Sequence, residues 1–287
     1  MAFHAGELAV QRRAGVGEQG YFAEAAMPPV ARDFLAAQSW IALGTEDAQG
    51  RVWASLHYGA PGFIATPAPD VVHVAAAPPA GDPLAGAPDG PVGGLALEPS
   101  TRRRMRLNGD AVSDAAGTTI RLEQVYSNCP KYIATRAVEA VVGRPVPVRA
   151  VSDAIDGAAT DLLAAADTAF VATRGPDGFD VSHRGGRPGF LDVVDAHTLV
   201  WPDYQGNRMF NTLGNLAVDG GCGLTVVDPE DGTTLYVTGR AEVLWEPVRA
   251  VRLTVAAVVR LEHAAPLRWR LERVARNPLL EARPQLA

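Results

Sequence analysis

Hydrophobic and polar positions alternate over short runs along most of the chain, and turn-forming residues separate these runs. The turns contain Asp-Gly or related pairs at residues 47–50, 176–178 and 230–232. Alternation with period two and a high content of Val, Thr, Trp and Tyr predict half-buried strands. Helical spacing is limited to short stretches such as residues 31–38 and 159–166. The pattern predicts a mainly β protein with a few short helices, folded as an antiparallel barrel or sandwich.

One pattern of residues occurs twice. Residues 35–63 and residues 163–190 differ in length by one position, and both end in S-x-[HR]-x-G-x-P-G-F. The similarity continues in the same order to residues 120–122 and 251–253. Because a repeat determines the architecture, we expect two barrels of one design. The expected organisation is an N-terminal extension (1–30), a first barrel with a degenerate cofactor site (31–142), a linker (143–158), a second barrel (159–262) and a C-terminal tail (263–287).

Composition agrees with two packed cores and narrows the functional classes. The 287 residues are 47% hydrophobic and 20% charged, and a chain of this length usually forms two domains. The net charge of -6 gives no general attraction to nucleic acid or to an anionic membrane, so we expect neither partner. No apolar run approaches the roughly 18 residues of a membrane span, and we expect a cytoplasmic protein. Cys129 and Cys222 form no paired motif, which indicates reduced thiols.

The two copies differ most after the matched runs at residues 71–74 and 198–201. The second copy reads YQGNRMFNTLGNL from residue 204, and its apolar positions have helical spacing, with Asn207 as the expected helix cap. The first copy has a proline-rich loop at residues 75–91, which cannot form a helix. Only the second copy carries this polar segment, so we expect the functional site of the protein there.

A phosphate site is the chemistry that these residues indicate. Free amides and the dipole at a helix start favour an anion, and Arg208 lies on the expected first turn. Ser182 and Arg184 are two positions apart on a predicted strand, so they project from one face and add donors. The alternative is that Asn207 only caps a helix and that the arginines are solvated.

Further residues are candidates for contacts around this phosphate. Aromatic and apolar side chains next to it are predicted to offer a flat surface to a ring system, although core positions are the alternative; they are Phe190, Leu191, Trp201 and Tyr204. Asp203 accepts a hydrogen bond from a ligand or serves in a turn. The single lysine of the chain, Lys131, is expected in the first turn of a helix with Pro130, capped by Ser127 or Asn128. A lysine opposes the dipole there, so we predict that it contacts another partner such as a phosphate or a flavin carbonyl; a surface lysine is the alternative.

Several motifs are set aside. Ser182 and His183 are neighbours on a strand and face opposite ways, so they are no nucleophile and base. The glycines of residues 185–189 open no helix and form no dinucleotide fingerprint. The histidines lack metal-ligand spacing, and no metal is expected. Cys129 is interpreted as structural, with a reactive thiol at a helix start as the alternative.

Four segments resemble the pyridoxamine 5'-phosphate oxidase-like superfamily of FMN-binding split barrels, in particular its bacterial proteins with two barrels in tandem. They are FHAGELAVQRRAG from residue 3, SNCPKYI from 127, WPDYQGNRMFNTLGNL from 201 and LRWRL from 267. The resemblance implies six-stranded split barrels that bind FMN at an interface between two barrels. Members of the superfamily hold the phosphate with a basic strand residue and with a Ser-Arg-Lys turn. Residues 206–208 correspond to that turn in this sequence. Asn207 then replaces the hydroxyl, and Met209 the second basic residue.

The resemblance also implies a function. The expectation is an FMN-dependent oxidoreductase acting on an unknown small molecule, with NAD(P)H as a candidate reductant. The motif that grips pyridoxamine phosphate is not found near residues 267–273. A pseudo-dimer of barrels within one chain, with Lys131 from the first copy, is expected to form the flavin site; a homodimer is the alternative.

Alternatives to this function remain open. One is a non-catalytic flavin or haem carrier, with His4, His57 or His183 as the axial ligand of a haem. Another is a deazaflavin in place of FMN. In a third, both barrels are degenerate and only mediate association.

Overall fold

The fold was analysed in a computed structural model that describes residues 3–17, 23–127, 129–141 and 146–275. Strands of the first half are β1 (Trp40–Glu46), β2 (Val52–Tyr58), β3 (Ile64–Ala68), β4 (Val71–Val74), β5 (Gly90–Glu98), β6 (Arg103–Asp114), β7 (Gly117–Ser127) and β8 (Thr135–Ala140). Strands of the second half are β9 (Val148–Ser152), β10 (Thr168–Gly175), β11 (Gly178–Gly185), β12 (Asp192–Asp195), β13 (Thr198–Pro202), β14 (Gly221–Val227), β15 (Thr234–Leu244), β16 (Ala250–Glu262) and β17 (Leu267–Arg273). The helices are α1 (Ala5–Arg13), α2 (Pro29–Ala36), α3 (Gly157–Ala165) and α4 (Asn211–Val218).

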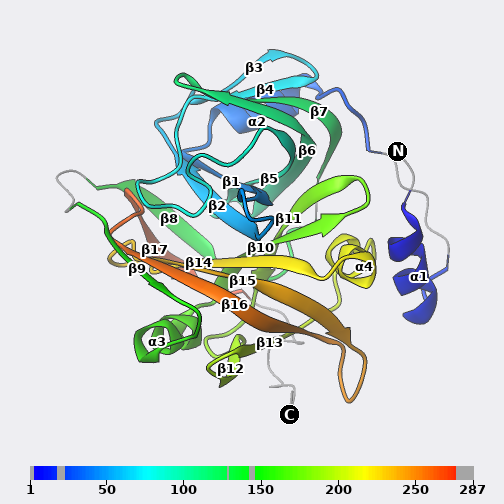
Figure 1. Cartoon of the computed structure of the whole chain (residues 1–287). Coiled ribbons are helices and arrows are strands. Elements are labelled where there is room, and N and C mark those ends of the chain that lie inside the picture. Colours follow the sequence, from blue (N-terminus) through cyan, green and yellow to red (C-terminus); the bar gives the residue numbers. More distant parts are fainter. Residues whose placement is uncertain (1–2, 18–22, 128, 142–145, 276–287) are drawn as a thin grey trace.

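Two large antiparallel sheets dominate the molecule, one above the other in Figure 1. The order in the first sheet is β2-β1-β5-β6-β7-β4-β3, and in the second it is β11-β10-β14-β15-β16-β13-β12, with β9 beside β16. The two orders agree strand by strand. The expectation of a mainly β protein with two tandem split barrels is therefore confirmed. Each path contains seven strands instead of the six implied by the resemblance, because β3 and β12 add short strands to β4 and β13.

Two of the predicted helices are confirmed with small shifts. The helix expected at 31–38 is α2, which begins earlier because Pro29 is suited to the first helical position. The helix expected at 159–166 is α3, and the Asp156 side chain caps it by accepting a hydrogen bond from the Ala159 amide at 2.7 Å. Each of these helices precedes the first strand of its sheet.

The helix expected to start after Asn207 is wrong in its boundary. Asn207 does not cap it; α4 begins at Asn211, with Phe210 in the cap position. Arg208 and Phe210 have φ values of 63° and 62°, a left-handed conformation that a helix excludes. The Asn207 side chain instead accepts a hydrogen bond from the Met209 amide at 3.1 Å, which forms a local turn.

The helix expected around Pro130 is also wrong. Residues 129–134 are turn and irregular structure that leads into β8. Tyr132 has a φ of 66°, which interrupts any helical run here. Ser127 is the last residue of β7 and caps no helix, and Asn128 lies outside the described residues. Lys131 therefore sits in a turn, and the argument from a helix dipole does not apply to it.

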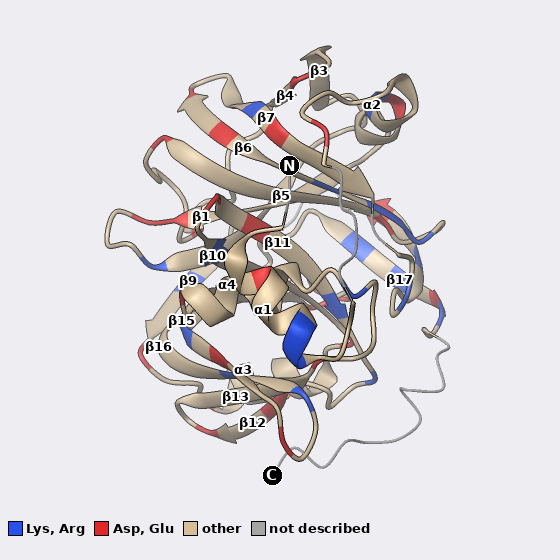
Figure 2. Cartoon of the chain, turned by 90° about the vertical axis from the view of Figure 1, so that its right-hand side faces the viewer, with Lys and Arg blue, Asp and Glu red and all other residues tan. Residues whose placement is uncertain are grey.

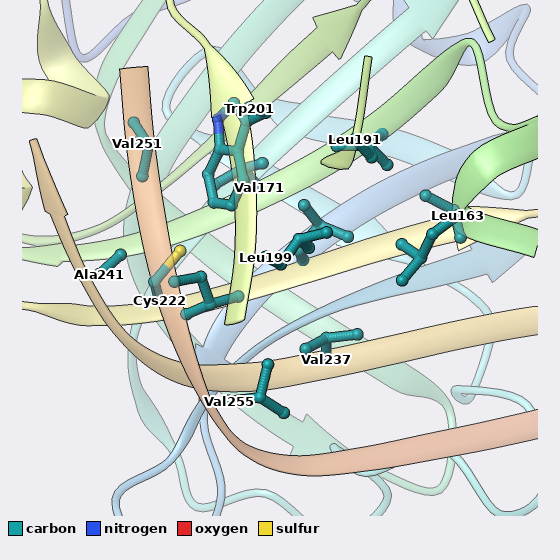
Figure 3. Packing of buried hydrophobic residues seen from close by; sticks show 14 of the residues in the cluster. Leu163, Val171, Leu191, Leu199, Trp201, Cys222, Val237, Ala241, Val251 and Val255 are labelled. Atoms are coloured by element: carbon teal, nitrogen blue, oxygen red, sulfur yellow. The ribbon is translucent and has the colours of Figure 1, made fainter. Parts of the chain in front are cut away.

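Each sheet has a hydrophobic core of its own. In the second half, β13, β14, β15 and β16 enclose a cluster that includes Leu199, Trp201, Cys222 and Val237, with Leu163 of α3 against it (Figure 3). The first sheet encloses Phe34 of α2 in the same way. The helix that precedes each first strand thus packs against its own barrel.

The two sheets meet face to face through β1, β2 and β5 on one side and β10, β11 and β14 on the other. A Cβ atom on Gly223 would lie 2.6 Å from the Cα of Trp53, and one on Gly93 would lie 2.7 Å from the Cα of Asp180. These contacts are too short for any side chain larger than hydrogen. The Thr225 hydroxyl donates to the backbone oxygen of Ala54 at 2.6 Å, which adds a polar link between the sheets.

Segments assigned to the extension, linker and tail pack on the barrels. In the predicted linker, β9 pairs with β16, and residues 142–145 lie outside the described part of the chain. In the predicted tail, β17 pairs with β8 of the first half. Helix α1 lies against α4 of the second half (Figure 2, where the acidic residue of α1 is red and its terminal arginines are blue).

Candidate functional site

A group of arginines lies where β6 of the first sheet faces β11 of the second. Arg104 and Arg106 of β6 and Arg184 of β11 form it, together with Arg249 of the loop between β15 and β16, which shares Asp203 with Arg184. We call these four arginines the cationic cluster. Arg104 and Arg106 are two apart on β6 and project from one face. Burial, together with the nearby charges of Arg106 and Arg184, lowers the pKa of Arg104 to about 9. Burial also lowers the pKa of Arg184. Both shifts mean that positive charge is crowded in a poorly hydrated place.

Two carboxylates face the four guanidinium groups. Asp180 accepts from Arg106 at 2.6 Å. Asp203 accepts from Arg184 at 3.2 Å and from Arg249 at 2.7 Å. The contacts between described residues therefore leave a surplus of two positive charges. The buried Nε atoms of Arg104 and Arg184 have no hydrogen-bond partner among the described residues, so both side chains keep a donor for a ligand.

Ser182 and Arg184 come from β11 as predicted, but they meet different partners. The Ser182 hydroxyl accepts from Arg106 Nη2 at 2.8 Å and is hydrogen-bonded to the hydroxyl of Thr212, in the first turn of α4. Arg184 is paired with Asp203. Ser182 thus belongs to a satisfied network at the start of α4, whereas Arg184 retains a free donor.

Lys131 lies beside the segment 204–208, as the sequence indicated. Its Nζ is 3.5 Å from the backbone oxygen of Gln205, which also accepts from the Tyr132 hydroxyl at 2.8 Å. The rings of Tyr132 and Tyr204 stack with centroids 5.3 Å apart. The turn of the first half therefore contacts the loop that leads to α4. Asn207 and Arg208 are exposed on that loop, and Arg208 does not lie on the first turn of α4.

The predicted apolar surface for a ring system is only partly available. Phe190, Leu191 and Trp201 are at most 6% exposed and belong to the core of the second sheet (Figure 3 labels Leu191 and Trp201). They pack against other core side chains and line neither of the two cavities described below. Tyr204 is half-buried and is the one predicted aromatic residue that borders the cationic cluster through Asp203.

An open cleft beside the cluster supplies the missing apolar surface. We call it the β6 cleft. It has a volume of about 680 Å³ and combines arginines of β6 with apolar side chains, among them Arg104, Phe34, Val125 and Met209. This volume is within the range of small-molecule sites. Arg104 lines the cleft and belongs to the cationic cluster, so an anion at the cluster and a ring in the cleft would be neighbours.

The corresponding place in the first copy is filled by the chain itself. Ser55 stands in the repeat where the second copy has Ser182. Its hydroxyl donates to Asp82 at 2.7 Å, and Asp82 comes from the proline-rich loop at 75–91. Burial raises the pKa of Asp82 to about 6. A carboxyl group at this point disfavours a second anion, in agreement with a first copy that lacks a phosphate site.

Arg104, Arg106 and Arg249 were missed by the sequence reasoning. A usable signal was present for two of them, because residues 102–106 read RRRMR at the start of the segment that forms β6. Alternate arginines on a strand share a face. Arg249 carried no comparable signal, since it follows a turn that contains a proline.

The remaining candidates lie elsewhere. His4 caps α1, accepting from the Gly6 amide, and its Nε2 bonds Asn215. The Nδ1 of His57 is 3.2 Å from the backbone oxygen of Ala76, and burial lowers the pKa of His57 to about 4.

In the described residues no three His, Cys, Asp or Glu side chains gather as metal ligands. Cys129 and Cys222 are free thiols, as expected. No helix in the described ranges is long and apolar enough to cross a membrane.

Comparison with known proteins finds a similarity for the second half of the chain. The family described as pyridoxamine 5'-phosphate oxidase matches residues 155–278. The comparison with curated proteins gives no match.

Among solved structures, a putative pyridoxamine 5'-phosphate oxidase from Corynebacterium glutamicum is 15% identical, with 40% of this chain and 100% of that chain covered and a TM-score of 0.28. An FAD binding protein from Mycobacterium smegmatis is 16% identical, with 39% and 98% covered and a TM-score of 0.27. HupZ from Group A Streptococcus is 18% identical, with 37% and 98% covered and a TM-score of 0.31.

Proposed function

We propose, from the match of residues 155–278 to the family described as pyridoxamine 5'-phosphate oxidase, that this chain is an FMN-dependent oxidoreductase acting on a small organic molecule. The observation that carries the proposal is the cationic cluster. Its surplus of positive charge is buried at the junction of the two sheets and opens into the β6 cleft. Proteins of one fold can have different functions, so the proposal rests on the residues of this site as well as on the fold.

The residues of the cluster fit the phosphate group of FMN. A phosphate monoester carries a charge of about -1.5 to -2 near neutral pH, which matches the surplus of two positive charges. Arg104 and Arg184 each retain an unpartnered buried Nε. Guanidinium groups bind phosphate in a planar, two-pronged arrangement that lysine cannot reproduce. A bound phosphate would therefore satisfy both the charge and the open donors.

Each part of the site has a role in this proposal. Arg104 and Arg184 hold the phosphate, and Asp203 orients Arg184 through the ion pair described above. The β6 cleft accommodates the flavin ring against Phe34 and Met209. A bound flavin would accept hydride or electrons from a reductant. The chain contributes position, charge and partial exclusion of water.

The pairing of the two sheets supports a site made by one chain. Arg104 comes from the first sheet and Arg184 from the second. Lys131 of the first half also contacts the loop of the second half. A pseudo-dimer within the chain therefore provides both sides of the proposed site, and a monomer should bind one FMN per chain.

Replacement of Arg184 by alanine is expected to weaken FMN binding by about 10- to 100-fold, because a hydrogen bond to a charged group is worth about 1.5–3 kcal/mol. The affinity is measured by quenching of FMN fluorescence on titration with the protein. The control is Arg121→Ala, since Arg121 is exposed and pairs only with the partly exposed Asp70 at 3.5 Å. Equal affinity of the two variants would contradict the site.

The variant Arg208→Ala separates the two possible placements of the phosphate. Arg208 is exposed on the loop before α4, so the loss of its charge should change the affinity by less than about fivefold. If Arg208→Ala releases FMN and Arg184→Ala does not, the phosphate lies at the loop and the cationic cluster is not its site.

A second experiment tests catalysis. The FMN-loaded protein is expected to lose its flavin absorbance when NADH or NADPH is added without oxygen, and to regain it when air is admitted. A flavin that stays oxidised with both reductants would favour a carrier. The visible spectrum of the purified protein also tests the other cofactors, because a haem gives a Soret band and a deazaflavin absorbs at shorter wavelength than FMN.

A further inference from the structure

A second cavity is lined by residues of both sheets and of β17. Strand β17 pairs with β8 of the first half (Figure 1). The cavity has a volume of about 530 Å³. Three aromatic side chains form much of its wall: Trp40 packs edge-on against Phe170 at 5.3 Å and against Trp269 at 6.4 Å between ring centroids. Neither Arg104 nor Arg184 lines it. We call it the aromatic cavity, and it is separate from the β6 cleft.

One polar side chain interrupts the apolar wall. His183 lines the cavity, as does Leu56 of the first copy. These two residues occupy the same place in the repeat, because each follows the matched serine, Ser55 or Ser182. The second copy thus has an imidazole where the first has a hydrocarbon side chain. His183 is 5% exposed, and such a burial of a polar group is unfavourable unless the group finds a partner.

The tautomer of His183 follows from its contact with Arg104. Arg104 Nη1 is 3.2 Å from His183 Nδ1, and a guanidinium group can only donate. Nδ1 is therefore the unprotonated nitrogen. Burial and the nearby charges of Arg104 and Arg184 lower the pKa of His183 well below its usual value, so the ring is neutral. The single ring proton is then on Nε2, which makes Nε2 a hydrogen-bond donor.

This donor has no partner in the described part of the chain. Nδ1 is taken by Arg104, which does not line the cavity, so the opposite edge of the ring with Nε2 is the edge available to it. A ligand must therefore offer an acceptor. The same proton argues against His183 as the axial ligand of a haem, since a ligating nitrogen must be unprotonated.

The charged groups of the lining do not call for a charged ligand. Arg136 and Asp167 form a close ion pair with each other, and Arg268 donates to the backbone oxygens of Ala265 and Leu267. Asp228 accepts from the backbone amides of Glu230 and Asp231, and Arg270 and Glu230 are exposed to solvent. Among the buried side chains of the lining, the features left for a ligand are the aromatic surfaces and the Nε2–H group. A neutral, flat molecule with one oxygen acceptor matches both of them.

We propose that the aromatic cavity binds a planar aromatic carbonyl compound, with its rings against Trp40, Phe170 and Trp269 and its carbonyl oxygen accepting a hydrogen bond from His183 Nε2. This site is additional to the FMN site and does not depend on it. Arg104 connects the two, because it faces the β6 cleft and holds the His183 ring.

The test uses two probes of the same shape, 2-acetylnaphthalene and 2-ethylnaphthalene, titrated by calorimetry into the full-length protein. The ketone is expected to bind about tenfold more tightly than the hydrocarbon, because only the ketone satisfies the buried donor. In His183→Leu, which installs the residue of the first copy, the two probes should bind equally. Failure of both probes to bind, or a preference for the ketone that survives in His183→Leu, would overturn the proposal.

Two further variants keep the result interpretable. Phe170→Leu removes part of the aromatic wall. It should weaken the binding of both probes about equally, while the preference for the ketone persists. Unchanged affinity of both probes for this variant would count against the cavity, even if His183→Leu does not fold. Arg184→Ala should bind the ketone as the wild type does although it binds FMN poorly. Saturation with FMN should also leave ketone binding unchanged, and competition between them would overturn the separate site.

Discussion

The variant Asp180→Ala is expected to lower the free energy of unfolding by about 3–5 kcal/mol, the usual cost of leaving a buried charge without its partner. Arg106 and Asp180 form an ion pair of 2.6 Å between β6 and β11, and their side chains are only 11% and 6% exposed. Tyr126 also donates to Asp180 at 3.2 Å. The pair therefore connects the two sheets in a place where water cannot replace the lost carboxylate.

Urea denaturation followed by circular dichroism measures this effect. The matched control is Asp70→Ala, because Asp70 pairs with Arg121 at the surface, with side chains 44% and 75% exposed. An exposed pair contributes about 0–1 kcal/mol. The double variant Arg106→Met, Asp180→Leu should recover much of the loss, since no charge is then buried alone. If Asp180→Ala is no less stable than Asp70→Ala, the ion pair does not stabilise the junction of the sheets.

Asp82 is expected to make stability fall with rising pH. Burial raises the pKa of Asp82 to about 6 in the folded protein, from its ordinary value of 3.8. The folded state therefore holds the proton more tightly than the unfolded chain, so this stabilisation is complete below about pH 3.8 and is lost as pH rises through about 6. The difference in pKa corresponds to about 3 kcal/mol, at 1.36 kcal/mol per unit. Burial, with a 4% exposed side chain, is the main cause.

The variant Asp82→Asn isolates this contribution from that of other acids. Asparagine keeps an oxygen to accept from the Leu84 amide and gains a donor toward Ser55. The unfolding free energy of variant and wild type is compared at about pH 4 and about pH 7. The variant should gain about 3 kcal/mol relative to the wild type over this interval. Parallel pH profiles would show that Asp82 is ionised in both the folded and unfolded states.

The alternation of apolar and polar residues was sufficient to predict the strands and the internal repeat. The runs at 71–74 and 198–201 correspond to β4 and β13, which pair with the long strands β7 and β16. Strand alternation is a property of near neighbours in the sequence, so it can be read without a structure. Lys131 was expected to reach the site from the first half of the chain, and it lies 3.5 Å from the backbone oxygen of Gln205, although the helix from which it was argued is absent; its contact with a ligand stays a prediction.

Local pattern failed where tertiary contacts override propensity. Apolar residues at 209–217 have helical spacing, yet left-handed residues at 208 and 210 delay α4. Trp201 and Phe190 were predicted to offer a flat surface to a ligand, but both pack in the hydrophobic core of the second sheet. A sequence does not show whether an aromatic residue next to a strand end faces the core or a ligand, because both positions suit the same side chain.

By itself, the sequence determined that the chain is mainly β, that it contains one design twice, and that the second copy alone carries a polar loop after its fourth strand. Only the tertiary structure decided which charges meet. Arg104 and Arg184 are 80 positions apart, and their crowding arises because two sheets pack through glycines and place β6 against β11. Buried charge depends on neighbours from both sheets, and no local pattern of residues encodes that arrangement.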